Sequence, residues 1–470
     1  MALLIKAVVP IIRRLTRRSR NLLIGIALAS LCGIGVAAAD MSNAAIATAA
    51  ITGLCAAWWV LEPIPIPVTS LIPFAAFPLC GVLSHRKVAT AYGDSMILLL
   101  MGGFMLSTAI EHTGVHRRIA LGMVRLTGGT GRRTVLGFML ASAMCSMWIS
   151  NTATVLMLLP VALAVIDSQD GERLAFPLLL GIAYAASVGG MGTPIGTPPN
   201  LIFMKIYQDH TGKTISFLQW MTIALPVVVV FVPIIWLWIT RSLRGVPAPQ
   251  LPATGRWTQP EKRVLIVFAL TAAAWVFRRQ PLGGWSGLLG VTQAGDSTVA
   301  LAAVVVLFLV PNGEGEGEAL LRWDKARDIP WGLLLLFGGG IAISQAFDAS
   351  GLSAKLGVAL AGLSHWPALA IIFIISLAVT FMTEVTSNTA TTNLLMPILA
   401  AAAVAANVDP MLLMVPATMS ASCAFMLPVA TAPNAIVSGA GVPTARMARE
   451  GVALNIIGAV VITTICWLTL

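Results

Sequence analysis

The pentapeptide Ser-Asn-Thr-Ala-Thr at residues 150–154 occurs a second time at residues 387–391, an offset of 237 residues. Ser146 and Thr383, two residues with a hydroxyl group, form a further pair at the same offset. Polar motifs matched at one fixed offset indicate that the chain contains an internal repeat.

A proline-containing motif follows each copy of the pentapeptide. It reads Gly-Thr-Pro-Pro-Asn at residues 196–200 and Ala-Thr-Ala-Pro-Asn at residues 430–434. Thr197 and Thr431 can act as N-caps, with proline in the first turn behind them, so each motif is expected to restart an interrupted helix. The sequence therefore predicts two broken helices at corresponding places in the repeat.

Each pentapeptide lies in the middle of a long apolar stretch, 134–166 or 366–406. A helix that simply crosses a membrane would not carry such a polar cluster at its centre. A hairpin that enters the membrane and returns to the same side can carry one at its tip, provided that the tip is buried in protein or lines a cavity. We therefore expect two re-entrant helical hairpins.

The composition places the chain in a membrane. Of its 470 residues, 57% are hydrophobic and only 10% are charged, and the mean hydropathy is +0.89. Soluble domains carry about 25% charged residues, so a water-soluble enzyme, a disordered chain and a nucleic-acid binder are excluded. The net charge of +10 is attributed to basic loops on the cytoplasmic side.

Eleven further apolar stretches approach the length of about 20 residues that a membrane-crossing helix needs. They are 22–39, 44–61, 66–83, 95–110, 174–191, 215–239, 262–277, 297–311, 331–347, 410–427 and 451–470. With a cytoplasmic N-terminus, 22 of the 29 Lys and Arg residues fall in cytoplasmic segments, and the C-terminus lies outside. The predicted fold class is an all-α polytopic membrane protein with about 11 transmembrane helices plus two re-entrant hairpins.

The first apolar run has a second interpretation. Residues 22–36, followed by Ala37-Ala38-Ala39, also fit a cleaved secretory leader. The rest of the chain is equally apolar, which favours a first membrane helix.

In the predicted layout the two hairpins enter from opposite sides, so the repeat has inverted topology. Interrupted segments at matching places of an inverted repeat are typical of a transporter site near the membrane midplane. The four motifs contain no Lys, Arg or His. An anion there would be held by amide groups, hydroxyls and helix N-termini, while carbonyl and hydroxyl oxygens suit Na⁺, which would supply the missing positive charge.

Other interpretations are open at this point. Small polar residues are common where membrane helices pack closely, so the tips could be packing elements. An intramembrane enzyme would need a nucleophile beside a base or paired carboxylates, but Glu384 stands alone and no His lies near a candidate Ser. Glu384 either bonds to tip backbone or serves a coupling ion or proton. A channel would need rings of carbonyls or charges along a pore.

These motifs resemble the divalent anion/sodium symporters, a family of di- and tricarboxylate carriers and sodium/sulfate carriers. Residues 421–437 match the family signature at every fixed position, from Ala421-Ser422 through Pro428-Val429-Ala430 to Asn434 and Ile436-Val437. The resemblance implies a homodimer that works as an elevator. It implies scaffold helices at 1–130 and 241–364 and transport-domain halves at 131–240 and 365–470.

The resemblance also implies site residues. One Na⁺ would be held by Ser146, Ser150, Asn151 and Gly196, and the other by Thr383, Thr386, Asn388 and Ala430. The substrate would meet Ser150, Asn151, Thr152, Thr197, Ser387, Asn388, Thr389, Thr431 and Ala432. Ala432 departs from the proline that many relatives carry, which leaves open the choice among succinate-like, citrate-like and sulfate-like anions.

The expected function is transport rather than catalysis. We expect Na⁺-coupled import of a small dianionic carboxylate such as succinate, malate or fumarate across a bacterial inner membrane, with the lipid bilayer and a second copy of the chain as partners. Sulfate or citrate symport, or exchange within the same family, are the alternatives. The resemblance implies basic side chains at the Na⁺ positions of exchangers, and the hydroxyls of Ser146 and Thr383 therefore favour symport.

Overall fold

A computed structural model describes most of the chain, and its described residues are 16–167, 172–243, 245, 255–280, 283–315, 317–360 and 366–470. These residues are helical or irregular, with no β-strand beyond an isolated bridge between Pro311 and Ala319. The predicted all-α class is confirmed. Arg13 and Arg14, part of the basic stretch expected on the cytoplasmic side, lie outside the described residues.

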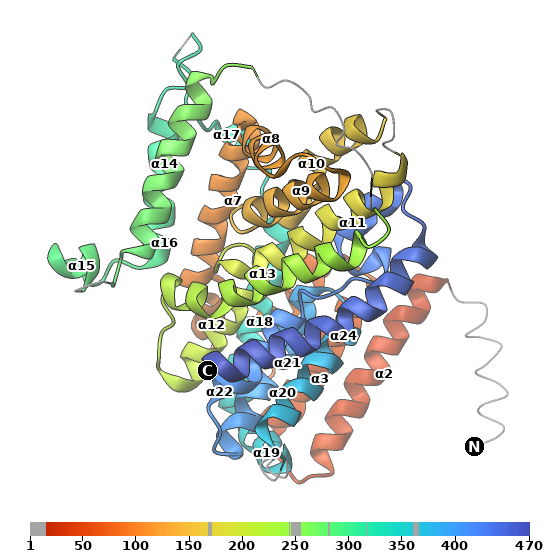
Figure 1. Cartoon of the computed structure of the whole chain (residues 1–470). Coiled ribbons are helices and arrows are strands. Elements are labelled where there is room, and N and C mark those ends of the chain that lie inside the picture. The colour runs from red at the N-terminus through yellow and green to blue at the C-terminus, as the bar shows by residue number, and fades with distance from the viewer. Residues whose placement is uncertain are drawn as a thin grey trace. The chain divides into compact units, whose positions relative to one another are not determined.

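The chain divides into two compact units, and Figure 1 labels their helices. The first comprises Met1–Asp94, Trp331–His365 and Thr389–Pro410, and the second comprises Ser95–Pro330, Trp366–Asn388 and Met411–Leu470. All predicted site residues except Thr389 fall in the second unit.

The first unit is a helical bundle built on α2 and α3. Its helices are α2 (Arg17–Ala37), α3 (Asn43–Leu61), α4 (Ile66–Thr69), α5 (Ile72–Leu79), α6 (His85–Tyr92), α18 (Trp331–Ser350), α19 (Leu352–Leu360) and α21 (Asn388–Ala405), whose first residue is counted with the other unit. Asn21 Nδ2 donates to the Leu61 carbonyl at 2.8 Å and fastens the start of α2 to the end of α3. In α18, a Cβ atom at Gly338 would lie 2.6 Å from the Tyr92 ring, so glycine lets α6 pack closely there.

The second unit carries both predicted broken helices. Its first part comprises α7 (Ser95–Thr113), α8 (Val115–Thr127), α9 (Gly131–Ser146), α10 (Asn151–Ile166), α11 (Glu172–Gly189), η1 (Gly190–Gly192), α12 (Pro198–Thr211) and α13 (Phe217–Ile239). There follow α14 (Gln259–Val276), α15 (Gly284–Leu288), α16 (Asp296–Leu309), α17 (Trp323–Ala326), α20 (Ala368–Thr383), α22 (Pro410–Ser420), η3 (Pro428–Ala430), α23 (Ala432–Gly439) and α24 (Thr444–Thr469).

Each predicted hairpin stretch is two helices separated by a short tip. α9 and α10 are joined by four residues that end with Ser150, and the two helices are in contact. α20 ends at Thr383 and α21 begins at Asn388, so the second tip is equally short. The tips coincide with the polar motifs, as the sequence predicts.

Eight helices of the described residues are long and apolar enough to cross a membrane. Several shorter apolar helices accompany them, and the count of eleven crossings stays a prediction. The stretch 66–83 is not one helix but α4 and α5, because several prolines interrupt it. The stretch 410–427 is helical only as far as Ser420.

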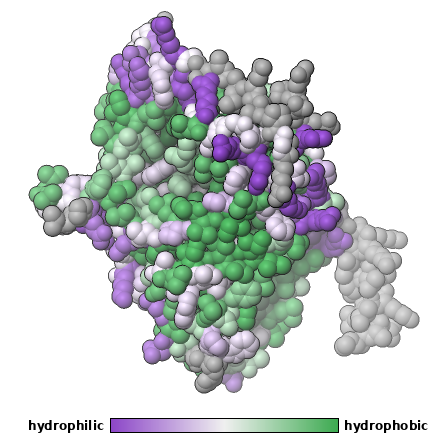
Figure 2. Space-filling view, viewed as in Figure 1, coloured by the Kyte–Doolittle hydropathy of each residue, from purple (hydrophilic) through white to green (hydrophobic). Residues whose placement is uncertain are grey.

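Large apolar side chains cover the surface of the second unit where α13 and α24 face outward. Val229 is 67% exposed on α13 and Leu468 is 76% exposed on α24. Figure 2 shows apolar residues over much of the face in view. A water-soluble protein does not carry such extended apolar patches, and a bilayer accounts for them.

Candidate substrate and sodium site at two hairpin tips

The first hairpin tip gathers three oxygen atoms. Ser146, the last residue of α9, is fully buried, and its Oγ lies 2.5 Å from Asn151 Oδ1 and 2.7 Å from the Ala186 carbonyl oxygen. Asn151 is the first residue of α10, and Ala186 belongs to α11 just before that helix breaks. The cluster therefore joins both arms of the hairpin to the broken helix.

The second tip repeats this arrangement atom for atom. Thr383 Oγ1, at the end of α20, lies 2.7 Å from Asn388 Oδ1 and 3.0 Å from the Ala421 carbonyl oxygen. Ala421 directly follows α22 and is the first residue of the irregular segment that leads to η3. The internal repeat seen in the sequence is thus a repeat of hydrogen-bonding geometry.

Each cluster holds more oxygen acceptors than protons. A hydroxyl carries one proton, so Ser146 can donate to only one of its two neighbours, and the same holds for Thr383. With the asparagine amide oxygen facing the hydroxyl, three oxygens meet around one proton. A cation with a preference for oxygen ligands would relieve this excess of acceptors, which makes both clusters suitable for Na⁺.

Two glycines let the first broken helix approach its cluster. A Cβ atom at Gly190 would lie 2.6 Å from Asn151 Oδ1 and 3.2 Å from the Gly196 carbonyl oxygen. A Cβ atom at Gly196 would collide with the Gly190 carbonyl oxygen. Ser146, Asn151 and Gly196, three residues of the predicted first Na⁺ set, are therefore brought together around Gly190.

A buried asparagine organises each helix break from inside. Asn200 Nδ2 donates to the carbonyl oxygens of Gly190 at 3.1 Å and Thr193 at 2.7 Å. Asn434 Nδ2 donates to those of Ala424 at 2.9 Å and Leu427 at 3.1 Å. Among the described residues, neither Asn200 Oδ1 nor Asn434 Oδ1 has a hydrogen-bond partner. Each break therefore contains one buried acceptor that is not satisfied.

The predicted N-caps differ between the two repeats. Thr431 Oγ1 accepts a hydrogen bond from Asn434 N at 3.2 Å and caps α23, as expected. Thr197 occupies the N-cap position of α12, but its side chain accepts no hydrogen bond from the helix. Thr197 is therefore the N-cap residue of α12, as predicted, but only its carbonyl oxygen takes part in the first turn, accepting from Asn200 N at 3.2 Å.

Glu384 accepts hydrogen bonds from backbone, as one of the two alternatives expected, but this backbone belongs to the second helix break and not to the hairpin tip. Its carboxylate is 2% exposed and accepts hydrogen bonds from the backbone N–H groups of Phe425 at 2.7 Å, Met426 at 2.9 Å and Leu427 at 3.0 Å. Asn455 Nδ2 on α24 donates to it as well, at 2.8 Å. The carboxylate thus satisfies the backbone that the break between α22 and η3 leaves exposed.

The other predicted residues lie around these clusters. Ser150 Oγ caps α10 by accepting from Ala153 N at 3.2 Å, and Thr386 Oγ1 donates to the Met382 carbonyl at 2.9 Å. The remaining positions, at or next to a tip or a helix break, are Thr152 in the first turn of α10, Ser387 before α21, Thr389 in the first turn of α21, Ala430 at the end of η3 and Ala432 at the start of α23. Of these, Thr389 and Ala430 are buried and Ala432 is exposed.

A buried hydrogen bond near the two helix breaks connects the repeats. Tyr184 on α11 donates through its hydroxyl to the Phe425 carbonyl oxygen at 2.6 Å, and the two rings lie edge to face with centroids 4.9 Å apart. Tyr184 is two residues before Ala186 of the first cluster, and Phe425 is one of the residues that Glu384 holds.

Sequence reasoning missed the two carbonyl oxygens of the clusters and the two buried asparagines. Ala186 and Ala421 contribute backbone oxygens, and because every residue has a backbone oxygen, the residue type does not reveal them. Asn200 and Asn434 were visible as members of the repeated proline motifs, and their conserved spacing within the two halves was the available signal. Asn455 has no counterpart in any motif quoted from the sequence.

Two hairpin tips, each packed against a broken helix with the same set of polar groups, define a secondary transporter. The family model described as "Citrate transporter" matches residues 56–418. The chain belongs to this family, and its resemblance to the divalent anion/sodium symporters is confirmed.

Curated relatives agree with this assignment. The chain is 39% identical, over 91% of its length and 86% of the relative, to the "Sodium-dependent dicarboxylate transporter SdcS" of Staphylococcus saprophyticus. It is 38% identical, over 89% of its length and 84% of the relative, to proteins of the same name from Staphylococcus aureus.

A solved structure shows a similar fold. The YdaH transporter of Alcanivorax borkumensis, described as having an unusual topology, aligns with a TM-score of 0.57 over 80% of this chain and 86% of that one. The sequence identity is 13%, so the likeness concerns the fold alone.

Proposed function

We propose that the protein is a Na⁺-coupled symporter that imports C4-dicarboxylates such as succinate, malate and fumarate. The two matched oxygen clusters, Ser146 with Asn151 and Ala186 and Thr383 with Asn388 and Ala421, carry the proposal. Relatives named as sodium-dependent dicarboxylate transporters support both the ion and the substrate class.

In this proposal each cluster forms the core of one Na⁺ site. The first site is completed by Ser150 and Gly196, and the second by Thr386 and Ala430. The bound ions place two positive charges beside the tips, so a dianion can be held by neutral donors without a Lys or Arg. The substrate-binding residues are Ser150, Asn151, Thr152, Thr197, Ser387, Asn388, Thr389, Thr431 and Ala432.

The proposed carrier is a homodimer in an inner membrane, with its N-terminus in the cytoplasm and its C-terminus outside. Residues 131–240 and 365–470 form the moving part, and residues 1–130 and 241–364 form the scaffold. The compact units of the structure, which are defined by contacts, divide the chain differently.

Uptake of labelled succinate into proteoliposomes tests the proposal. An inward Na⁺ gradient should drive accumulation, and replacing Na⁺ with choline should abolish it. Asn151→Ala and Asn388→Ala should each abolish uptake while expression and dimerisation are retained, because each removes an oxygen from a cluster. Equal uptake in choline, or full uptake by either variant, would contradict the proposal.

Citrate is a second candidate substrate, favoured by the description of the matching family model. Ala432 is exposed and carries only a methyl group, where the family resemblance implies a proline, and this leaves more room for a larger anion. Competition decides between the two: excess citrate that suppresses succinate uptake as strongly as unlabelled succinate does would favour the citrate assignment.

A further inference from the structure

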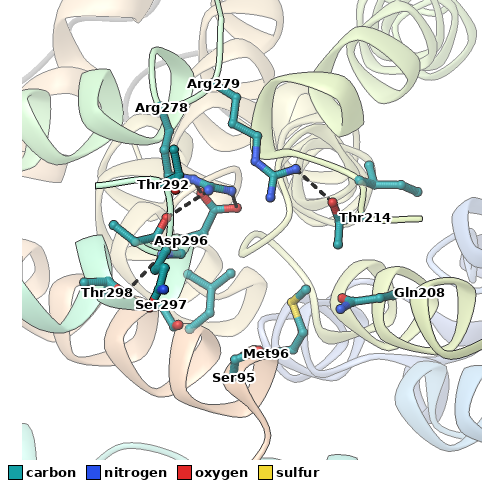
Figure 3. Close-up of a pocket in the computed structure, with 15 residues that line it drawn as sticks. Ser95, Met96, Gln208, Thr214, Arg278, Arg279, Thr292, Asp296, Ser297 and Thr298 are labelled. Carbon is teal, nitrogen blue, oxygen red and sulfur yellow. Dashed lines mark hydrogen bonds and ion pairs between the residues drawn. The ribbon is translucent and has the colours of Figure 1, made fainter. Parts of the chain in front are cut away.

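A cavity of about 300 Å³ with several polar side chains lies in the second unit (Figure 3). None of its lining residues belongs to a hairpin tip. The start of α7, the α12–α13 connection and the residues that precede and begin α16 line it. Its lining includes the polar side chains of Ser95, Gln208, Thr214, Arg278, Arg279 and Asp296.

The cavity carries one uncompensated positive charge. Arg278 is buried and forms a two-pronged ion pair with Asp296, with Nε 2.5 Å from Oδ1 and a terminal nitrogen 3.1 Å from Oδ2. Arg279 is exposed and donates to Thr214 Oγ1 at 2.8 Å, and within the described part of the chain it has no carboxylate partner. Figure 3 shows its guanidinium directed toward Thr214 across the cavity.

The first turn of α16 adds donors at the same place. α16 is 14 residues long, and its first three residues, Asp296 to Thr298, line the cavity. The N–H groups of a first helical turn have no partner within the helix and lie at the positive end of its dipole. Arg279 and this turn therefore offer two separate sets of hydrogen-bond donors to one ligand.

We propose that this cavity is a second anion site, which binds a small dicarboxylate before it reaches the hairpin tips. One carboxylate meets the Arg279 guanidinium, and the other meets the first turn of α16. The identity of the anion, although not the existence of the site, rests on the proposed function.

The position of the cavity suits an entrance. In the layout predicted from the sequence, Ser95, Thr214 and Arg279 all lie on the outer side, from which the substrate arrives. α12 begins beside Thr197 of the first broken helix and ends at the α12–α13 connection. A helix of this length spans about 21 Å, so one helix connects the two sites.

Binding without sodium separates this cavity from the tips. Labelled succinate is added to the purified full-length Asn151→Ala variant in neutral-lipid nanodiscs, with choline in place of Na⁺. Saturable binding should remain, and an additional Arg279→Gln change should weaken it at least about tenfold, because a charged hydrogen-bonded partner is lost. Arg279→Lys should weaken it less, since the charge stays while the planar fork is lost.

Arg133→Gln is the matched control, because it removes an exposed arginine from the start of α9 and should leave this binding unchanged. No saturable binding in choline, or an equal loss in Arg133→Gln, would overturn the proposal. Displacement of succinate by phosphatidylglycerol added to the discs would assign the pocket to a lipid headgroup instead and also overturn it.

Transport gives an independent readout. In Na⁺-driven uptake, Arg279→Gln should raise KM for succinate several-fold while kcat and the Na⁺ dependence are retained. Unchanged KM would contradict the entrance role. If uptake by the unaltered protein fails while Na⁺-independent binding persists, the proposed function is wrong and the anion site stands.

Discussion

Glu384 is a charged residue in a setting where charge is costly, and its surroundings explain why it is tolerated. The break after α22 leaves backbone N–H groups without partners in a helix, including that of the fully buried Phe425. A carboxylate is an acceptor-only group with several lone pairs, and Glu384 receives three backbone donors and one amide donor. The charge is shared among four hydrogen bonds.

The change Glu384→Gln should destabilise the protein by about 1–3 kcal/mol, the range for an unsatisfied buried group. A glutamine can present its oxygen to Phe425 and Met426, but its NH₂ group then faces the N–H of Leu427 without an acceptor. Thermal unfolding of the purified protein measures the effect. An unaltered unfolding temperature would show that the carboxylate does not stabilise the break.

Asn455→Ala is the comparison variant for this site. It removes one of the four donors to Glu384 and leaves the three backbone bonds in place. Its loss of stability should therefore be smaller than that of Glu384→Gln, and the reverse order would contradict the assigned role.

At the scale of elements, the two broken helices use different means to begin again. α23 starts with a side-chain cap from Thr431, whereas α12 starts at Thr197 without one. The carbonyl bonds of Asn200 and Asn434 are common to both breaks. The two halves therefore share the asparagine–carbonyl hydrogen bonds and differ in the side-chain cap.

This difference predicts unequal effects of the same substitution. Thr431→Val should cost about 0.5–2 kcal/mol, the range for loss of an N-cap, while Thr197→Val should cost clearly less because no cap is lost. Thermal unfolding of both variants, with Thr431→Ser as the retained-cap control, checks this. Equal losses in the two valine variants would contradict the asymmetry.

The junction between α8 and α14 contains an ion pair whose strength should depend on pH. Arg118 Nε lies 2.8 Å from Glu261 Oε1, and Glu261 also accepts from the Thr258 N–H at 2.7 Å. Burial alone would raise the pKa of the Glu261 carboxyl, but Arg118 and Thr258 together lower it below its ordinary value. The stabilisation is complete above the carboxyl's unfolded pKa of about 4.3 and is lost as the pH falls through the lower folded pKa.

Glu261→Gln should therefore lower stability at neutral pH by about 1–3 kcal/mol, because the buried side chain loses its charged hydrogen bond with Arg118. The difference from the unaltered protein should shrink as the pH is lowered below about 4, because both proteins then lack the charge. Unfolding temperatures measured between pH 7 and pH 3.5 test this, and a gap that widens on acidification would refute it.

How far the elements could be predicted depended on local signals. The hairpins were predictable because a polar motif interrupts each apolar run at its middle. The end of α22 at Ser420 was not, since the groups that stabilise the break come from Glu384, about 40 residues earlier, and from Asn455 on α24. Hydropathy cannot register an acceptor so far away in the sequence.

The side-chain contacts of the two oxygen clusters were predictable from the sequence. Ser146, Asn151, Thr383 and Asn388 were marked by the repeat, and the structure brings each hydroxyl to its asparagine. The carbonyl oxygens of Ala186 and Ala421 were invisible, because every residue has one. Their selection depends on where a helix unwinds, which is a property of the packed structure.

At the scale of the whole molecule, an aromatic stack connects the first tip to α14. The Trp148 ring lies 5.9 Å from Phe217 and 6.4 Å from Trp275, nearly parallel to both, and 5.1 Å from Phe268 edge to face. Trp148 and Phe217 belong to the proposed moving part, and Trp275 and Phe268 to the proposed scaffold. The stack would have to separate if these parts slide past each other.

Cross-linking tests this movement. In a background without native cysteines, a thiol cross-linker between Trp148→Cys and Trp275→Cys should abolish uptake, because it ties the tip to α14. The same treatment of Phe268→Cys with Trp275→Cys, both on α14, should leave uptake as it was before cross-linking. Undiminished uptake after the first cross-link would place the boundary between moving and fixed parts elsewhere.

The bond from Tyr184 to Phe425 has a consequence for ion leakage. Tyr184 precedes Ala186 of the first cluster by two residues, and Phe425 donates its N–H to Glu384, which directly follows Thr383 of the second cluster. We therefore expect a shift of one cluster to be passed to the other through this hydrogen bond. In the proposed carrier the two ions would change sides together or not at all, so sodium could not slip inward one ion at a time and dissipate the gradient without its cargo.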